Sequence, residues 1–476
     1  MREPSRIAGI RTAGTLAIAA IVAAACGSGA TPSSIGSPLA TPASAPPATA
    51  SAQPYQSSGS GELAFVEGNA HTVAPAQDNG AGAAAELNDF GFDLLRHLDS
   101  SGNLCASPTS VALALAMIEP GAKGQTAAEM ATVLHSFGAA DQDGEIVALL
   151  DSLRSKTFYA DSNGQPLEQG ASPDPAAPDP IVQLNVANQA FLQKSMPFDE
   201  KYLDDIRSTF GSGIGTLDFN ADPEAARLAI NKWANDQTNG RIPSILQPGD
   251  IQTATRLALA DAIYLKAAWD RPFDPTLTKS RNFTTAAGSV VSVPTMASEL
   301  QLAYAAGKGY RAVELPMAGN SLTMTIVEPD DMAAFVGSLD ETRLAAIVAA
   351  ESSSDVELTL PRFSIDTRFD LTQTLAAMGM PTVFSDAADL SGIAPVSPLN
   401  PQGLEIAKVV HQANIDVVEQ GTTAAAVTVA IGVAAGIPET PPTHVQFNVD
   451  KPFVYLIRDT SSGAVLFMGR VDDPSR

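Results

Sequence analysis

The sequence predicts an α+β fold, because helical patterns dominate its early part and strand patterns its end. Apolar residues recur at helical spacing over residues 87–98. Residues 447–457 and 464–471 instead alternate as strands do, around a Ser-Gly turn. The chain has 476 residues, 45% of them hydrophobic, which suffices for a sizeable core. A repeating βαβ fold would require strands and helices to alternate throughout, and they do not.

The early elements are predicted to be helices. Ser107 and Pro108 precede an apolar run over 111–117, which is typical of a capped helix with proline near its start. Residues 226–235 predict another helix, which ends near Gly240. Residues 371–378 predict a third that stops at Gly379.

The later elements are predicted to be strands. The runs 257–265, 322–327 and 356–360 are short and mostly apolar, as buried strands are. Residues 162–180 are rich in Pro, Gly, Ala and Asp and predict a surface loop.

The first 25 residues resemble a secretory signal peptide. Three arginines precede a short apolar run over 16–25, too short for a comfortable transmembrane helix. Small residues directly before Cys26 resemble a bacterial lipoprotein cleavage site and predict lipidation of Cys26, although Ala23 stands where leucine is usual. Ordinary secretion is the alternative. We expect an extracellular protein, anchored to the cell surface through Cys26 or released.

A linker is predicted to separate this segment from a folded domain. Residues 27 to about 60 are almost wholly Ser, Thr, Ala, Pro and Gly, which cannot bury a core. Residues 61–82 are ambiguous and are grouped with them, giving a linker over 27–82 and a domain over 83–476.

The charge of the chain argues against polyanionic partners, and its cysteine content argues against a disulfide. Twenty-eight Lys and Arg face 52 Asp and Glu, a net charge of −24, so nucleic acid is not an expected partner. The sequence has no Lys/Arg cluster that would suit heparin. Cys105, the only cysteine besides Cys26, predicts a buried small hydrophobic residue and no disulfide.

Enzyme motifs are missing from the sequence. It has no G-x-S-x-G elbow, P-loop, dinucleotide fingerprint or H-E-x-x-H motif, and its five histidines are scattered. We therefore expect neither catalysis nor a cofactor or metal site.

A series of motifs in one order resembles the serpin family from about residue 85 onward. The motifs are Asn-Leu-Cys-Ala-Ser-Pro (103–108), Gly-Ala-Lys-Gly-Gln-Thr (121–126), Ile-Asn-Lys-Trp (230–233), Asp-Ala-Ile-Tyr-Leu-Lys-Ala (261–267), Val-Pro-Thr-Met (293–296), Leu-Pro-Arg-Phe (360–363), Asp-Lys-Pro-Phe (450–453) and Leu-Phe-Met-Gly-Arg-Val (466–471). The resemblance implies three β-sheets, eight or nine helices and an exposed reactive-centre loop. It also implies a suicide substrate: a serine protease cleaves the loop, which then inserts into the large sheet and traps the acyl-enzyme, a strand addition known for the family.

The segment from Glu419 fits such a loop. Small residues alternate with other residues along this segment and could therefore share one face of an inserted strand. The segment contains no proline before Pro438, so each of its residues can donate a backbone hydrogen bond. An Ala-rich helix or idle linker is the alternative. Thr423 stands where inhibitory members usually carry glutamate. The hinge residues predicted from the resemblance are Glu419, Gly421, Thr422, Thr423, Ala424, Ala425, Ala426 and Thr428.

The family's spacing places the cleaved bond between Ala435 and Gly436, with an uncertainty of about two residues. The small, neutral residues around it suit elastase-like or subtilisin-like proteases. A non-inhibitory carrier or binding protein of the same fold is the alternative function. We expect a monomer whose apolar loop makes it prone to loop–sheet polymers.

The resemblance also implies a buried polar group beneath the large sheet, the family's shutter. Its predicted members are Ser107, Ser110, Asn231 and His411. Here His411 is expected to be structural, because buried hydrogen-bonded networks are costly to break.

Overall fold

The computed structural model describes residues 62–98, 101–137, 142–160, 167, 179–194, 196–422 and 443–476, all within the unit Pro54–Arg476. Its α-helices are α1 Ala81–His97, α2 Pro108–Ala116, α3 Gly124–Val133, α4 Asp143–Arg154, α5 Glu200–Phe210, α6 Pro223–Gln237, α7 Met332–Gly337, α8 Glu341–Ala349 and α9 Thr372–Met378. Short 3₁₀ helices are η1 Glu119–Gly121, η2 Pro275–Leu277 and η3 Thr382–Phe384.

The strands are β1 Ala64–Val66, β2 Leu104–Ala106, β3 Thr157–Phe158, β4 Val182–Gln193, β5 Ile214–Leu217, β6 Leu257–Ala268, β7 Lys279–Thr284, β8 Val290–Gly307, β9 Tyr310–Pro316, β10 Leu322–Pro329, β11 Ser352–Pro361, β12 Phe363–Asp370, β13 Lys408–Val418, β14 Gly421–Thr422, β15 Thr443–Asn448, β16 Phe453–Asp459 and β17 Val465–Val471. Among the described residues, nine α-helices fit the expected eight or nine, and the α+β class is confirmed.

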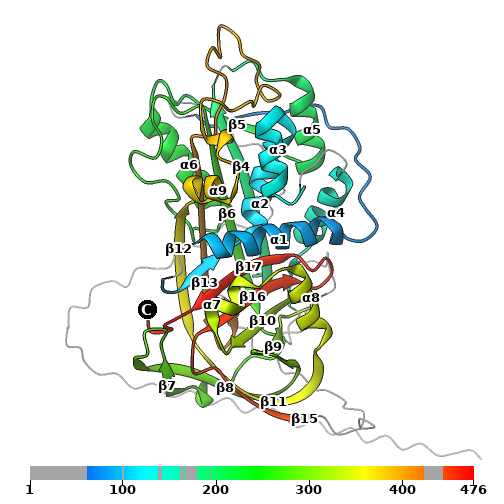
Figure 1. The fold of residues 1–476 in the computed structure, drawn as a ribbon, viewed down its shortest axis with the longest axis vertical. Coiled ribbons are helices and arrows are strands. Elements are labelled where there is room, and N and C mark those ends of the chain that lie inside the picture. The colour runs from blue at the N-terminus through cyan, green and yellow to red at the C-terminus, as the bar shows by residue number, and fades with distance from the viewer. Residues whose placement is uncertain are drawn as a thin grey trace, which may run out of the picture. The chain divides into compact units, whose positions relative to one another are not determined.

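The eight-stranded sheet contains the start of the predicted reactive loop. Its order is β1-β5-β4-β6-β14-β13-β12, with β3 paired to β4. Strands β6 and β13 pair directly and in parallel over residues 258–262 and 408–412. Farther along, the two-residue strand β14 lies between them and is antiparallel to both. Figure 1 shows β12 and β13 running side by side along the length of this sheet.

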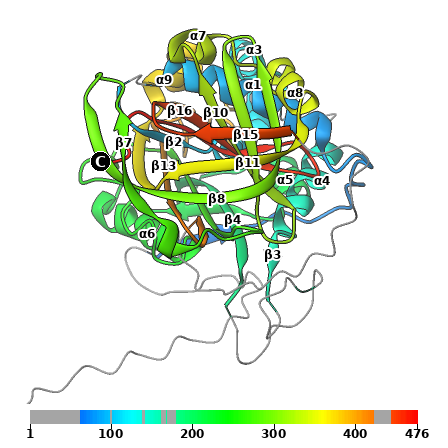
Figure 2. The ribbon, with the colours of Figure 1, turned by 90° about the horizontal axis from the view of Figure 1, so that it is seen from below.

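The remaining nine strands form a second hydrogen-bonded network in which β8 belongs to two layers. Residues 290–295 of β8 pair with β7, residues 295–304 pair with β11, and residues 303–307 pair with β9. Strands β15, β11 and β8 lie side by side in Figure 2, and β9, β10, β16, β17 and β2 continue the network. The second and third of the three expected sheets are therefore joined through β8.

Local sequence signals explain most element boundaries. The Ser107 side chain accepts a hydrogen bond from the Ser110 amide and caps α2, with proline in the first turn as expected. Helix α9 ends at Gly379, whose φ of 127° few other residues adopt. The predicted strand 447–457 is instead two strands, β15 and β16, because the residues before Pro452 leave the sheet and proline has no amide to donate.

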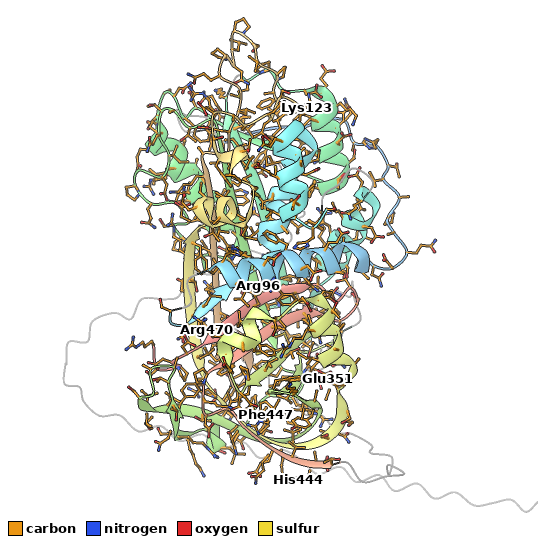
Figure 3. The ribbon with its side chains drawn as sticks, viewed as in Figure 1. Arg96, Lys123, Glu351, His444, Phe447 and Arg470 are labelled. Carbon is orange, nitrogen blue, oxygen red and sulfur yellow. The ribbon has the colours of Figure 1, made fainter. Side chains whose placement is uncertain are left out.

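Strand β15 is tied to the core through one aromatic side chain. Phe447, labelled in Figure 3, is fully buried and meets Tyr304 edge-on at 6.3 Å. The Arg311 guanidinium lies 4.9 Å from the centre of the Phe447 ring. Since β15 follows the predicted reactive loop directly, this contact fixes the loop's far end.

The linker boundary predicted at residue 82 needs correction. Residues 64–66 form β1, which pairs antiparallel with β5 at the edge of the eight-stranded sheet. Leu63 is buried beside this strand, and Asn69 and His71 donate backbone hydrogen bonds to side chains of α5. The apolar residues around 63–66 explain the docking, which composition alone left ambiguous. The predicted signal segment, Cys26 and most of the 162–180 loop lie outside the described residues.

Cys105 is buried and in no disulfide, and burial raises the pKa of its thiol to about 12. No helix among the described residues is long and apolar enough to cross a membrane.

Candidate functional site

The candidate site is the opening between β6 and β13. Beyond the paired residues 258–262 and 408–412, the two strands separate enough to admit β14. Gly421 and Thr422 pair with Ala268 and Ala267 on one side and with β13 on the other. The first residues of the predicted hinge thus already occupy a strand position within the sheet.

Gly421 is required by the close approach of the backbone. Its φ is 147°, and a Cβ at this position would lie 2.0 Å from the carbonyl oxygen of Ala267. No side chain fits there, so glycine lets the chain turn from β13 into the opening. Thr422, which follows, is 1% exposed.

The turn before β14 is held by three hydrogen bonds from the segment after β6. The backbone amide of Trp269 donates to the Gln420 carbonyl and the Phe273 amide to the Glu419 carbonyl, both at 2.9 Å. The indole Nε1 of Trp269 donates to the Val418 carbonyl at 2.9 Å. The hinge therefore starts from a fixed point.

Glu419 adds an ionic anchor to this fixed point. Its carboxylate accepts hydrogen bonds from the Arg362 guanidinium, with Nε at 2.8 Å, and from the Thr278 hydroxyl. Burial by itself would raise the pKa of Glu419, but the bonds from Arg362 and Thr278 outweigh it and leave the pKa below its ordinary value. The anchor is consequently a charged pair at neutral pH.

At the other end of the opening, a buried polar latch connects β6 to β13. His411 and Asp261 are direct register partners, both fully buried, and His411 Nδ1 bonds to the Asp261 carboxylate. The Ser107 amide donates to His411 Nε2 at 2.9 Å. Because Nε2 accepts a hydrogen bond, the proton of this neutral imidazole lies on Nδ1 and is donated to Asp261.

The latch extends along one row of the sheet. Asn188 on β4 is the register partner of Asp261 and accepts a 2.7 Å hydrogen bond from the Ser110 hydroxyl. Phe369 on β12 stacks on His411 with 6.5 Å between ring centres. The second oxygen of the Asp261 carboxylate has no partner among the described residues.

One predicted shutter residue, Asn231, does not belong to this group. Its side chain bonds to the backbone of Leu246 and to Ser244, within the segment that packs on α6. The structure brings Ser107, Ser110 and His411 together with Asp261 and Asn188, whereas Asn231 lies apart from this group. A single acidic residue within the apolar run 257–265 was the signal that could have identified Asp261.

Thr423, Ala424, Ala425, Ala426 and Thr428, and the predicted bond between Ala435 and Gly436, lie outside the described residues. Among the residues that are described, no group of three His, Cys, Asp or Glu side chains could hold a metal ion.

Strands β6 and β13 are held together at one end, and at the other end they are separated by the first residues of the adjoining loop. This arrangement is typical of a protein whose sheet can accept an additional strand. The family comparison agrees: the model described as Serpin (serine protease inhibitor) matches residues 85–474, so the chain belongs to the serpin family.

Individual relatives cover nearly the whole folded part. Leukocyte elastase inhibitor of Bos taurus is 34% identical over 398 residues, 81% of this chain and 97% of that protein. Human serpin B3 is 30% identical over 394 residues, with the same two coverages. The solved structure of tengpin, a thermophilic serpin in its native state, has a TM-score of 0.72 at 24% identity, covering 85% of this chain and 97% of that one. That last likeness concerns the fold.

Proposed function

We propose that this chain inhibits serine proteases of elastase-like or subtilisin-like specificity as a suicide substrate. The observation that carries the proposal is β14: the beginning of the loop already sits between β6 and β13, so further insertion continues an existing strand. Relatives named leukocyte elastase inhibitor support the class of target.

The chemistry belongs to the protease. Its serine oxygen attacks the Ala435 carbonyl carbon, the peptide bond to Gly436 breaks, and the amine of Gly436 leaves with a proton. The loop from Thr423 then extends β14 while still joined to the protease through the ester. Adding about a dozen residues at ~1 kcal/mol net per hydrogen bond gives on the order of 10 kcal/mol before side-chain burial.

Location and state of assembly form part of the same proposal. A lipid on Cys26, in the manner of bacterial lipoproteins, and the Ser/Thr/Ala/Pro/Gly-rich stretch after it would hold a monomeric inhibitor outside the cell. Labelling with a radioactive fatty acid, lost in Cys26→Ser, tests the anchor. An unlabelled Cys26 would leave a secreted inhibitor.

The inhibition test is a denaturing gel of the protein mixed with an elastase. We expect a covalent complex and a released peptide of about forty residues that begins near Gly436. The variant Ala426→Arg places a charge on the inserting face and should be cleaved without forming the complex. Cleavage of the unaltered chain without complex would refute inhibition and favour the carrier alternative.

A further inference from the structure

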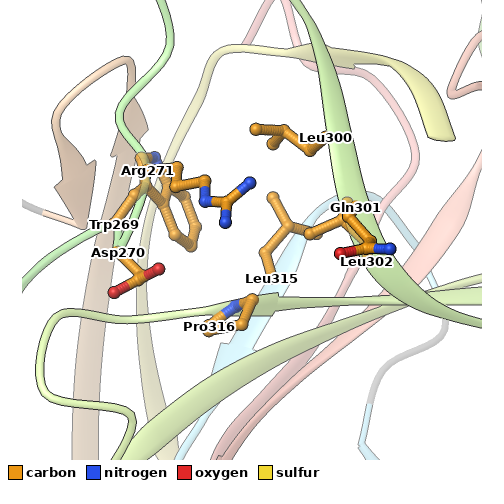
Figure 4. A pocket seen from close by; sticks show the side chains of 8 residues that line it. All are labelled: Trp269, Asp270, Arg271, Leu300, Gln301, Leu302, Leu315 and Pro316. Atoms are coloured by element: carbon orange, nitrogen blue, oxygen red, sulfur yellow. The ribbon is translucent and has the colours of Figure 1, made fainter. Parts of the chain in front are cut away.

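A small cavity lies beside the segment that anchors the hinge. It measures about 70 Å³ and is formed by the residues after β6 and by β8 and β9. Its walls are mostly apolar, as Figure 4 shows; the residues that matter are Trp269, Arg271, Leu300, Leu302, Leu315 and Pro316. The volume is several times the ~10–15 Å³ that a single water requires.

Arg271 is the cation of this cavity. Figure 4 shows its guanidinium reaching into the space between Trp269 and the leucines, while the Asp270 carboxylate points to another side. Within the described residues Arg271 forms no ion pair or hydrogen bond, although the chain carries an excess of 24 negative charges. By contrast, Arg362 and Arg458 each meet a glutamate.

These walls select for one kind of ligand. A guanidinium binds a carboxylate through two parallel hydrogen bonds, and the contact strengthens where apolar surroundings exclude water. Leu300, Leu302 and Leu315 then surround whatever is attached to the carboxylate, which favours a short branched aliphatic chain. A phosphate or a sugar would leave most of its polar atoms against leucine and is disfavoured.

The cavity and the hinge share Trp269. One face of this residue lines the cavity, while its amide and its indole Nε1 hold the carbonyls of Gln420 and Val418. An occupant that packs on Trp269 and pairs with Arg271 would restrain the segment from which the hinge is suspended. Binding would therefore favour the hinge position seen here over positions that require Trp269 to move.

From these observations we propose that the cavity is a binding site for a small aliphatic carboxylate, and that its occupancy steadies the hinge anchor. The site involves neither the predicted cleaved bond nor a protease, so it stands independently of the proposed inhibition.

The probe is 4-methylpentanoate, titrated into the full chain by NMR, with its uncharged amide as the matched ligand. We expect saturable binding of the acid at roughly 0.1–1 mM, as suits so small a ligand, and at least tenfold weaker binding of the amide. Arg271→Gln should weaken the acid about tenfold or more. Arg281→Gln, which removes an exposed arginine of β7, should leave binding unchanged.

Hydrogen exchange then tests the link to the hinge. At a ligand concentration ten times the dissociation constant, the amides of Trp269 and Phe273 should exchange about tenfold more slowly. The amide of Leu203 in α5, at the opposite end of the molecule from β8 and β9 in Figure 1, should not change. Absence of saturable binding, equal binding of acid and amide, equal binding by Arg271→Gln, or unaltered exchange at Trp269 would each overturn the proposal. The amide control uses the unaltered protein, so the result holds even if a variant fails to fold.

Discussion

Replacing His411 with alanine is expected to damage the latch more than the loss of one imidazole suggests. The variant leaves the Ser107 amide without an acceptor, which costs about 1–3 kcal/mol for a buried donor. It also leaves the Asp261 carboxylate fully buried with neither oxygen bonded to a side chain. Removing one partner of a buried pair costs about 3–5 kcal/mol. Taken near the lower ends of both ranges, these terms predict a loss of about 5 kcal/mol.

The loss translates into a thermal shift. At ~2.1 cal/mol/K per residue, the roughly 390 residues of the family match have an unfolding entropy near 0.8 kcal/mol/K, so 5 kcal/mol lowers the midpoint by about 6 °C. Circular dichroism at a fixed scan rate measures it, and native gels after mild heating report polymers from easier opening of β6 and β13. His444→Ala, which removes an exposed histidine of β15 labelled in Figure 3, is the control.

A second variant separates the two contributions. Adding Asp261→Ala to His411→Ala removes the stranded carboxylate and should restore about 3 kcal/mol, so the double variant is more stable than His411→Ala alone. A double variant that is less stable than His411→Ala would show that the latch does not control the opening. The same conclusion would follow if His411→Ala had the thermal midpoint of the control His444→Ala and the polymerisation rate of the unaltered protein.

Three other perturbations probe neighbouring contacts. Because the pKa of Glu419 is lowered in the folded protein, the contribution of this carboxylate to stability is complete above the ordinary pKa of 4.5 and is lost as the pH falls below that value. Glu419→Gln should therefore flatten the acid side of a profile of stability against pH. An unchanged acid side would contradict the proposed anchor. Gly421→Ala should expel β14, since its Cβ would meet the Ala267 carbonyl at 2.0 Å, and at least tenfold faster exchange of the following amide would show it. Lys156→Met strands the buried Asp459 carboxylate, now 2.8 Å from the Lys156 ammonium, and should cost about 3–5 kcal/mol in urea unfolding, part of which Asp459→Asn would recover.

The sequence predicted those parts of the molecule whose causes are local. The capped start of α2 and the glycine end of α9 follow from residues next to one another, and both are found. The ordered motifs also identified the family before any contact was known. Composition was ambiguous at β1, because a run of four apolar residues is too short to identify a strand and its pairing partner β5 lies far away in the sequence.

The error at Asn231 has a different physical origin. Membership of the latch depends on the register between β4, β6 and β13, and a one-residue change of register moves a side chain to the opposite face. No local signal fixes that register, because the paired residues Asn188, Asp261 and His411 lie far apart in the sequence. Asp261 was visible as a charge within an apolar run, but only its pairing with His411 shows what the charge does.

The two ends of the opening oppose one another mechanically. Each residue added to β14 must separate β6 from β13 a little farther, toward the row where His411 and Asp261 hold the strands together. The first residues to insert break few existing contacts, because β6 and β13 are already apart there. The later residues can insert only if the buried His411–Asp261 pair and its hydrogen bond from Ser107 are broken. Insertion should therefore halt after its first residues and proceed only when cleavage frees the loop to supply many new hydrogen bonds at once. On this account the latch sets the barrier and the loop supplies the driving force, so latch variants should change the rate of spontaneous insertion far more than the stability of the cleaved form, in which the latch strands are separated.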